Sequence, residues 1–320
     1  MSATYLSETD VADLVDMPLA LAAVEGMFAA FARGEVENVP RARAKGPGIV
    51  LHSMSATAGY LGVVGWKNYT TTRTGAKFLV GVHASDSGEL IALIEADRLG
   101  QFRTGAATAV AIRYMTAPEV DRVGLIGAGW QAETQLLAAC TVRPIREAIV
   151  YSRSAERRGE FAARMERELA AKLRRAIRVR AADEPGEAAA MRIVITATTS
   201  REPVFAADAL AADALVCAVG SNWANKAEVA AEVVARASAV VCDQVAACRT
   251  EAGELIQAAA GHFDWGRAVE LADVVAGKTA IPPSGVRLFK SVGLAAEDVA
   301  LAFSLVQLAR ERGVGQSLPF

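Results

Sequence analysis

A glycine turn between an apolar run and a helical segment is the feature that most constrains the fold. Residues 123–133 read VGLIGAGWQAE, in which the turn has the pattern G-x-G-x-x-A. The first glycine permits a tight turn, the second lets the backbone approach a pyrophosphate, and the alanine allows close helix packing. Plain βα turns also contain glycine, but this one follows a strand and opens a helix, which favours a dinucleotide-binding βαβ unit. The residues expected to contact the cofactor here are Gly127, Gly129, Trp130 and Gln131.

The patterns on the two sides of Pro118 differ. Before it, two helical segments precede glycine-punctuated strands between residues 48 and 95, which predicts a mostly antiparallel sheet. After it, short apolar runs alternate with helical segments, as is typical of a parallel sheet. These runs are 122–126, 148–151, 193–197, 215–219 and 240–242. We therefore predict an α/β protein with a Rossmann-type doubly wound parallel sheet and a separate α+β domain.

Composition narrows the class of protein. A chain of 320 residues exceeds the usual size of one hydrophobic core, which favours two domains. Its net charge of −2 gives no field that would attract nucleic acid or a membrane. The acidic N-terminus does not resemble a signal peptide, and no apolar run approaches the ~20 residues that span a bilayer. We expect a cytoplasmic enzyme without nucleic-acid or membrane partners and, since its three histidines lack ligand spacing, without a metal site.

The end of the second strand after the glycine turn bears on the choice of cofactor. NAD-binding domains usually place an acid there, about 20 residues after the motif, to hold the ribose 2′-hydroxyl. This chain instead has Tyr151-Ser152-Arg153. A guanidinium can pair with a 2′-phosphate, whereas an acid would repel it. NADP(H) is therefore favoured over NAD(H), with contacts from Ser152 and Arg153; the alternative is that Arg153 caps a surface turn.

Several polar residues in the first third are unusual for an apolar sheet domain. Arg41 and Arg43 follow a proline, His52 and Lys67 lie in strand patterns, and Arg103 opens an alanine-rich helix. For any single cation, a solvated surface position is the simpler interpretation. Several cations together would form a clamp for the carboxylate of an amino or keto acid.

A series of short motifs along the chain indicates a resemblance to a known protein family. In order they are LHSM, GWKNY, QFRTGAATAVA, GAGWQAE, TATTSREPV, AVGSNWANKAE, EAGELI and LFKSVG. On these motifs the chain resembles the ornithine cyclodeaminase/μ-crystallin family over nearly its whole length. The resemblance implies a substrate-binding and dimerisation domain from residues 1–118 and 297–320, a dinucleotide-binding domain from 119–296, and a homodimer.

The resemblance also implies roles for individual residues. Lys67, Arg103 and Arg41 would bind the substrate carboxylate, with Arg43 as the alternative to Arg41. Further cofactor contacts would come from Thr104, Thr198, Thr199, Ser221, Val292 and Gly293.

Two positions depart from the cyclodeaminases. Those enzymes carry an aspartate in the turn that here reads Gly220-Ser221-Asn222, and an amide cannot take up a proton at neutral pH. They also carry a glutamate, suited to an ornithine amine, where this chain has His52.

We therefore expect an NAD(P)H-dependent oxidoreductase that reduces imines of α-keto acids, of the ketimine reductase or amino acid dehydrogenase type. Lys67 is expected to donate a proton if burial lowers its pKa, with Asn222 orienting the substrate. The alternatives are an ornithine cyclodeaminase that recycles bound NAD and a non-catalytic NADPH- or ligand-binding protein like μ-crystallin. The resemblance leaves the substrate's ring size and stereochemistry open.

Overall fold

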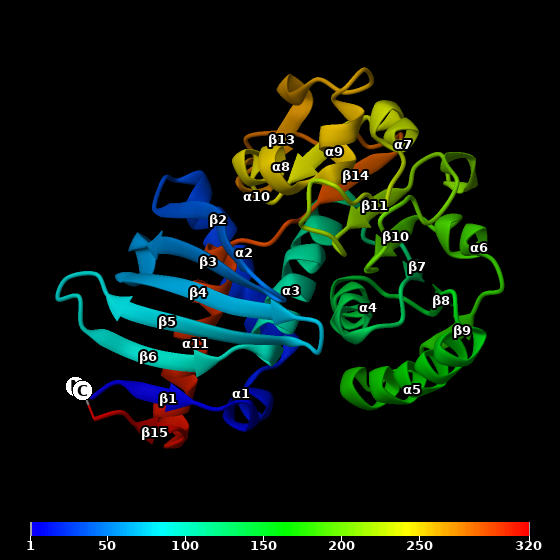
Figure 1. The fold of residues 1–320 in the computed structure, drawn as a ribbon. Coiled ribbons are helices and arrows are strands. Elements are labelled where there is room, and N and C mark those ends of the chain that lie inside the picture. The colour runs from blue at the N-terminus through cyan, green and yellow to red at the C-terminus, as the bar shows by residue number, and fades with distance from the viewer. Residues whose placement is uncertain (1, 320) are drawn as a thin grey trace. The chain divides into compact units, whose positions relative to one another are not determined.

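The computed structural model describes residues 2–319, which divide into two compact units (Figure 1). The first unit combines the chain up to Arg103 with the chain from Gly293 onward, and the second is Thr104–Val292. These limits differ from the expected boundaries at residues 118 and 297. The first division falls inside helix α3 (Asp97–Met115), because the alanine-rich part of this helix after Arg103 makes its contacts within the second unit.

The first unit is a sheet with helices packed on it. Its strands are ordered β15-β1-β6-β5-β4-β3-β2, and the four long neighbours β2 to β5 pair antiparallel. Helix α11 contacts strands β2 to β5 and helix α2, so this face of the sheet is covered (Figure 1). The elements are β1 (Thr4–Leu6), α1 (Glu8–Leu14), α2 (Met17–Ala32), β2 (Val36–Gly46), β3 (Ile49–Ala58), β4 (Val63–Thr72), β5 (Ala76–Ala84), β6 (Leu90–Glu95), α11 (Ala295–Arg312) and β15 (Gln316–Ser317).

Local sequence explains where the helices of this unit begin and end. Ser7 and Asp10 form a capping box at the start of α1, and Asp16 caps α2, whose first turn contains a proline. Helix α11 ends at Gly313, which adopts a left-handed φ of 65°. Its apolar side chains are almost all buried, as expected of a helix that lies on a sheet.

The second unit is a parallel sheet of eight strands in the order β13-β12-β14-β11-β10-β7-β8-β9. The chain runs outward from β7 through β8 to β9 and then returns to β10 on the other side of β7. This reversal creates a topological switch point beside β7, where ligands of such sheets bind. The sheet confirms the predicted Rossmann-type fold class. The strands are β7 (Arg122–Ile126), β8 (Glu147–Tyr151), β9 (Arg178–Ala181), β10 (Ile193–Thr196), β11 (Leu215–Ala218), β12 (Ala239–Cys242), β13 (Ala268–Glu270) and β14 (Arg287–Lys290).

Helices connect these strands. The longest, α5, is capped by Ser154, whose hydroxyl accepts a hydrogen bond from the Arg157 N–H. Strand β7 passes so close to α6 that a Cβ at Gly124 would collide with the Ala188 carbonyl, which explains the glycine in this strand. The helices are α4 (Trp130–Val142), α5 (Ala155–Leu173), α6 (Pro185–Ala189), α7 (Ala231–Arg236), α8 (Val245–Glu251), α9 (Gly253–Ala258) and α10 (Leu271–Val275).

Among residues 2–319, no single helix has both the length and the apolar character to cross a bilayer. Only the α1–α2 pair, bent by 91°, meets the length and composition criteria together.

Candidate active site

A cavity of about 630 Å³ opens at the switch point of the second unit. It is formed by the turns that follow β7, β8 and β10, so three neighbouring strands contribute their carboxyl ends. The residues that line it are Ile126–Gly129, Tyr151–Ser154, Arg157, Pro185, Ala197–Ser200, Pro203 and Val204. This position and size suit part of a dinucleotide.

The glycine turn is fixed against both neighbouring strands. The Gly127 N–H donates to the Tyr151 carbonyl at 2.8 Å, and the Ala197 N–H donates to the Ile126 carbonyl at 2.9 Å. Gly127 has a φ of 124°, and a Cβ there would collide with the Ala197 carbonyl. Both the backbone conformation and the close approach therefore require glycine at this position.

The donors of the cavity fit a nucleotide phosphate. Helix α4 begins directly after the turn, and Gly129 at its N-cap offers no side-chain cap, so the first N–H groups of the helix remain suited to a phosphate. Nothing lies within 4 Å of a Cβ built on Gly129, which leaves room for a pyrophosphate against the backbone. The lining contains Arg153 and Arg157, both exposed, and no carboxylate among the residues that the structure describes.

A buried carboxylate beneath the cavity holds two of its loops. Glu228 is fully buried and accepts hydrogen bonds from the Thr198 N–H and hydroxyl, both at 2.7 Å. Its other oxygen accepts from the Gly220 N–H at 2.6 Å and the Thr196 hydroxyl at 3.1 Å. Burial raises the pKa of Glu228, whereas the charge of Lys290 and the Thr198 hydrogen bonds oppose that rise. Glu228 thus joins the ends of β10 and β11.

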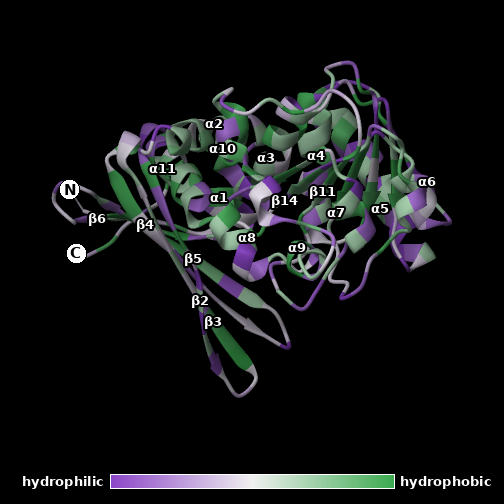
Figure 2. Cartoon of the chain, turned by 90° about the horizontal axis from the view of Figure 1, so that it is seen from above, coloured by the Kyte–Doolittle hydropathy of each residue, from purple (hydrophilic) through white to green (hydrophobic). Residues whose placement is uncertain are grey.

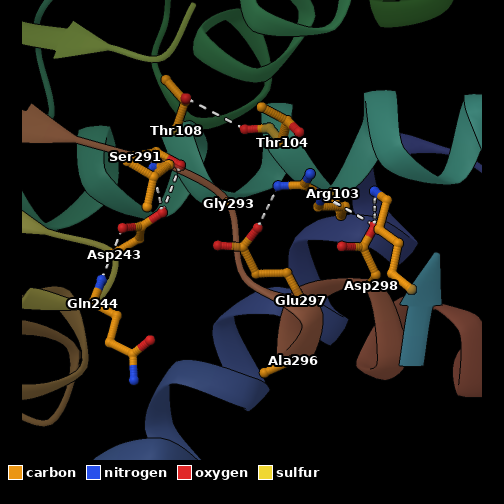
Figure 3. Close-up of polar contacts among 12 residues, drawn as sticks. Arg103, Thr104, Thr108, Asp243, Gln244, Ser291, Gly293, Ala296, Glu297 and Asp298 are labelled. Carbon is orange, nitrogen blue, oxygen red and sulfur yellow. Dashed lines mark hydrogen bonds and ion pairs between the residues drawn. The ribbon is translucent and has the colours of Figure 1, made fainter. Parts of the chain in front are cut away.

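A second set of buried charges fixes the segment after β14. The Lys290 ammonium lies 3.1 Å from Glu254 and donates to the Ser221 carbonyl at 2.7 Å. Asp243 accepts hydrogen bonds from the Ser291 hydroxyl at 2.9 Å and the Val292 N–H at 2.7 Å (Figure 3). The loop that carries Ser221 and the segment that carries Val292 are therefore held by charged groups with almost no solvent exposure.

The first unit contains a separate buried cluster of opposite charges. The Lys67 ammonium of β4 donates to Asp298 Oδ1 of α11 at 2.6 Å. Arg103 Nε donates to the same oxygen at 3.2 Å, and Arg103 Nη1 donates to Glu297 at 2.8 Å (Figure 3). Lys67 is 3% exposed, Arg103 is 9% exposed, and both carboxylates are 0% exposed. We call Lys67, Arg103, Glu297 and Asp298 the charge cluster.

Burial and neighbouring charges set the protonation of the charge cluster. Burial, together with the charges of Arg103 and Arg41, lowers the pKa of Lys67 to about 8, although Asp298 opposes this shift. Burial alone would also lower the pKa of Arg103, but Asp298 and Glu297 outweigh it and raise that pKa. Arg103 is thus a permanent cation, whereas Lys67 can exchange a proton near neutral pH.

Three stacked rings lie beside this cluster on strands β3, β4 and β5. The His52 and Tyr69 rings are parallel at 4.1 Å between centroids, and Phe78 stacks on Tyr69 at 4.8 Å. The Lys67 ammonium lies 5.3 Å from the centroid of the Phe78 ring. Burial, Arg43 and Arg41 lower the pKa of His52 to about 4, so this imidazole is neutral at pH 7.

Arg41 has contacts that connect it with the same cluster. Its Nη2 donates to the Gly293 carbonyl at 3.3 Å, and its guanidinium lies 6.0 Å from the centroid of the Tyr69 ring. Gly293 adopts a φ of 82°, and a Cβ there would lie 2.6 Å from Arg103 Nη1. Arg43 instead pairs in register with His52 across β2 and β3.

A sequence model of the ornithine cyclodeaminase/mu-crystallin family matches residues 1–313. The chain belongs to this family. The Delta(1)-pyrroline-2-carboxylate/Delta(1)-piperideine-2-carboxylate reductase of Azospirillum brasilense is 33% identical over 299 residues, which cover 91% of each chain. The iminosuccinate reductase of Paracoccus denitrificans is 29% identical over 326 residues, which cover 98% of each chain.

Solved structures of family members share the fold. The Delta(1)-pyrroline-2-carboxylate reductase of Thermococcus litoralis, in complex with NADH and L-proline, superposes with a TM-score of 0.92 at 28% identity. That alignment covers 98% of this chain and 100% of the other. The iminosuccinate reductase of Paracoccus denitrificans in complex with NAD+ superposes with a TM-score of 0.91 at 26% identity, covering 100% of both chains.

The residues predicted from the family motifs fall into separate groups. Lys67, Arg103 and Arg41 come together in the first unit. His52 is connected with this group because its ring stacks on Tyr69, which also lies near the Arg41 guanidinium. The predicted cofactor residues that line the cavity are Gly127, Gly129, Ser152, Arg153, Thr198 and Thr199. The other predicted residues lie elsewhere in the chain and do not line it: Thr104, Trp130, Gln131, Ser221, Asn222, Val292 and Gly293. Their proposed roles are taken up below.

Sequence reasoning missed the buried acids. Glu297 and Asp298 lie in the first turn of α11, where acids are common on any helix, so their positions carried no distinctive signal. Glu228 ends the motif AVGSNWANKAE, but the motif did not assign it a role. The signal in the sequence is a single carboxylate within a stretch rich in alanine and valine. This signal identifies a buried acid only when the hydrogen-bond donors around it are known.

Proposed function

We propose that this chain is an NAD(P)H-dependent reductase of imines derived from α-keto acids. The observation that carries the proposal is the Lys67 ammonium, which is buried against Asp298 with a pKa of about 8. Such a group can donate a proton near neutral pH while cations around it attract a carboxylate. The named relatives that reduce pyrroline carboxylate, piperideine carboxylate or iminosuccinate support the same reaction class.

The roles of the residues follow from their chemistry. A bound nicotinamide would supply hydride to the imine carbon, and the protein contributes positioning and electrostatics. Arg103 and Arg41 hold the substrate carboxylate, and Lys67 protonates the imine nitrogen. His52 remains neutral, so it can accept or donate a hydrogen bond without repelling a protonated imine.

The cofactor residues are proposed in two groups. Those at the cavity bind the adenosine and pyrophosphate part. Thr104, Trp130, Gln131, Ser221, Val292 and Gly293 are proposed by family likeness to contact the remainder of the cofactor. Asn222, in the loop after β11, is proposed to orient the substrate by hydrogen bonds.

The proposal is tested by incubating pure protein with NADPH and a panel of imines. The panel contains Δ1-pyrroline-2-carboxylate, Δ1-piperideine-2-carboxylate and iminosuccinate, and NADPH oxidation is followed by absorbance. We expect turnover with at least one of them. Binding of NADPH without turnover of any imine would favour the non-catalytic alternative.

A parallel assay tests the cyclodeaminase alternative. Ornithine is supplied with catalytic NAD, and proline and ammonia are measured. Cyclodeamination moves several protons in one closed site, and an amide at position 222 cannot carry them. We expect little proline to form. Rapid proline formation would contradict the reductase assignment and support the cyclodeaminase alternative.

The proposed preference for NADPH over NADH rests on Arg153. Arg153 and Arg157 are cations that line the cavity. Among the residues that the structure describes, no carboxylate lines it. Arg153→Ala should weaken NADPH binding by about 10- to 100-fold, as expected for a lost charge-assisted contact, and leave NADH binding nearly unchanged. Fluorescence titration with both cofactors measures this, with the exposed Arg146→Ala as control. An equal loss for both cofactors would mean that Arg153 does not read the 2′-phosphate.

We also propose that the chain forms a homodimer through the sheet of its first unit. Strand β2 is an edge strand, and part of β3 beside it is coloured as hydrophobic in Figure 2. Several apolar side chains on these two strands are exposed. They are Val39 at 48%, Ile49 at 42% and Leu51 at 42%. Such a surface is a favourable site for pairing between copies. A monomeric mass by light scattering at micromolar concentration would contradict the dimer.

A further inference from the structure

We infer that Asp298 is a positioning residue of the proposed site, whose carboxylate holds the Lys67 ammonium and the Arg103 guanidinium at a fixed spacing. In this arrangement Arg103 binds the substrate carboxylate while Lys67 delivers the proton. The inference rests on the proposed reductase function and names a residue that neither the motifs nor the family likeness assigned.

Lys67 and Arg103 share one oxygen of Asp298. Asp298 Oδ1 accepts from Lys67 Nζ at 2.6 Å and from Arg103 Nε at 3.2 Å. The two cations come from different elements, β4 and α3, and would repel each other without an anion between them. One buried oxygen therefore sets the distance between the proposed proton donor and the proposed carboxylate binder.

The backbone lies close to both cations and restricts where they can move. A Cβ at Gly100 would lie 3.1 Å from Lys67 Nζ, and one at Gly293 would lie 2.6 Å from Arg103 Nη1. The backbone thus approaches both cations closely, and larger residues at these glycines would displace them. If Asp298 is neutralised, Arg103 keeps Glu297 as a partner at 2.8 Å, whereas the backbone at Gly100 limits the movement of the Lys67 ammonium.

The other carboxylate oxygen of Asp298 lacks a hydrogen-bond donor within the part of the chain that the structure describes. Asp298 Oδ2 is buried and has no hydrogen-bond partner among residues 2–319. A buried acceptor without a donor costs free energy, so a purely structural position would be expected to satisfy it. Its retention is consistent with a functional constraint on this carboxylate.

The negative charge of Asp298 has a measurable effect on the pKa of Lys67. The charged groups that act most strongly on Lys67 are Asp298 from α11, Arg103 from α3 and Arg41 from β2. The Phe78 ring of β5 also lies nearby, and Glu297 of α11 is paired with Arg103. Asp298 is the one that raises the pKa of Lys67, against burial and both arginines. Removal of its charge should therefore lower this pKa below about 8. Because a proton donor must be protonated, reductase activity should then be lost at a lower pH.

The test compares pH profiles of Asp298→Asn, Glu297→Gln and the wild type. Reduction of Δ1-piperideine-2-carboxylate is measured at saturating NADPH from about pH 5.5 to 9.5. Asp298→Asn should move the midpoint of the alkaline limb of kcat down by about one unit or more, and should lower kcat at pH 8 by about 5-fold or more. Its affinity for NADPH should stay within about two-fold of the wild type, because the cofactor cavity lies in the other unit.

Glu297→Gln is the matched control, since Glu297 forms its ion pair with Arg103, whereas the Lys67 ammonium donates to Asp298. It should raise KM without moving the alkaline limb. If Asp298→Asn does not fold, Asp298→Glu keeps the charge but displaces the oxygen, and it should lower kcat with unchanged NADPH affinity.

The possible failures are distinguishable. An active wild type with an unmoved alkaline limb in Asp298→Asn, or full activity of Asp298→Glu, would overturn the positioning role and leave the reductase function intact. A wild type that reduces no imine in the panel would overturn the proposed function and this inference together.

Discussion

Lys67→Met should lower kcat for imine reduction by about 10²- to 10⁴-fold, the usual contribution of a positioned proton donor. Methionine has similar length and no charge, so it can occupy the buried position while removing both the proton and the ammonium. Asp298 keeps Arg103 as a partner at 3.2 Å, which limits the loss of stability. Steady-state kinetics at neutral pH, together with thermal denaturation and NADPH titration, would measure the effect.

A second substitution separates charge from proton transfer. Lys67→Arg keeps a cation, but a guanidinium does not release its proton near neutral pH. It should therefore recover substrate binding better than methionine while kcat stays low. The exposed Lys77→Met on β5 serves as the control for loss of a lysine. Full turnover of Lys67→Met on every imine that the wild type reduces would remove Lys67 from the proton-transfer step.

Glu228→Gln should weaken NADPH binding by about 10- to 100-fold, even though no side-chain atom of Glu228 lines the cavity. Both carboxylate oxygens accept hydrogen bonds, from Thr198 on one side and from Thr196 and Gly220 on the other. An amide has one oxygen, so its NH₂ group would face donors and leave them unsatisfied, at about 1–3 kcal/mol each. The loop that carries Thr198 lines the cavity, and it would then lose hydrogen bonds that hold its conformation.

Isothermal titration with NADPH and denaturant unfolding measure the two consequences of this substitution. Glu232→Gln on α7 is the control, because this nearby acid is exposed. We expect lower stability and weaker binding for Glu228→Gln, with neither change for Glu232→Gln. Unchanged NADPH affinity in a folded Glu228→Gln protein would show that the loop keeps its conformation without the carboxylate.

Sequence by itself determined the features that depend on neighbours along the chain. The glycine turn, its preceding strand and its following helix lie within a dozen residues, and each element has a local cause. The same holds for the alternation of strands and helices after Pro118, which predicted the parallel sheet. Family membership was also accessible, because its motifs are short contiguous runs, and the match to residues 1–313 confirms it.

Tertiary structure decided which charged residues are buried and what they contact. Lys67 and Asp298 are 231 positions apart, and Thr198 and Glu228 are 30 apart. From sequence alone, a lysine in a strand pattern is interpreted as a surface residue. An acid at the start of a helix is interpreted as one that interacts favourably with the helix dipole. Burial of a charge is stable only when an opposite charge and hydrogen-bond donors meet it in three dimensions. Pairing of that kind depends on how β4, α3 and α11 pack, which no local pattern in the sequence encodes.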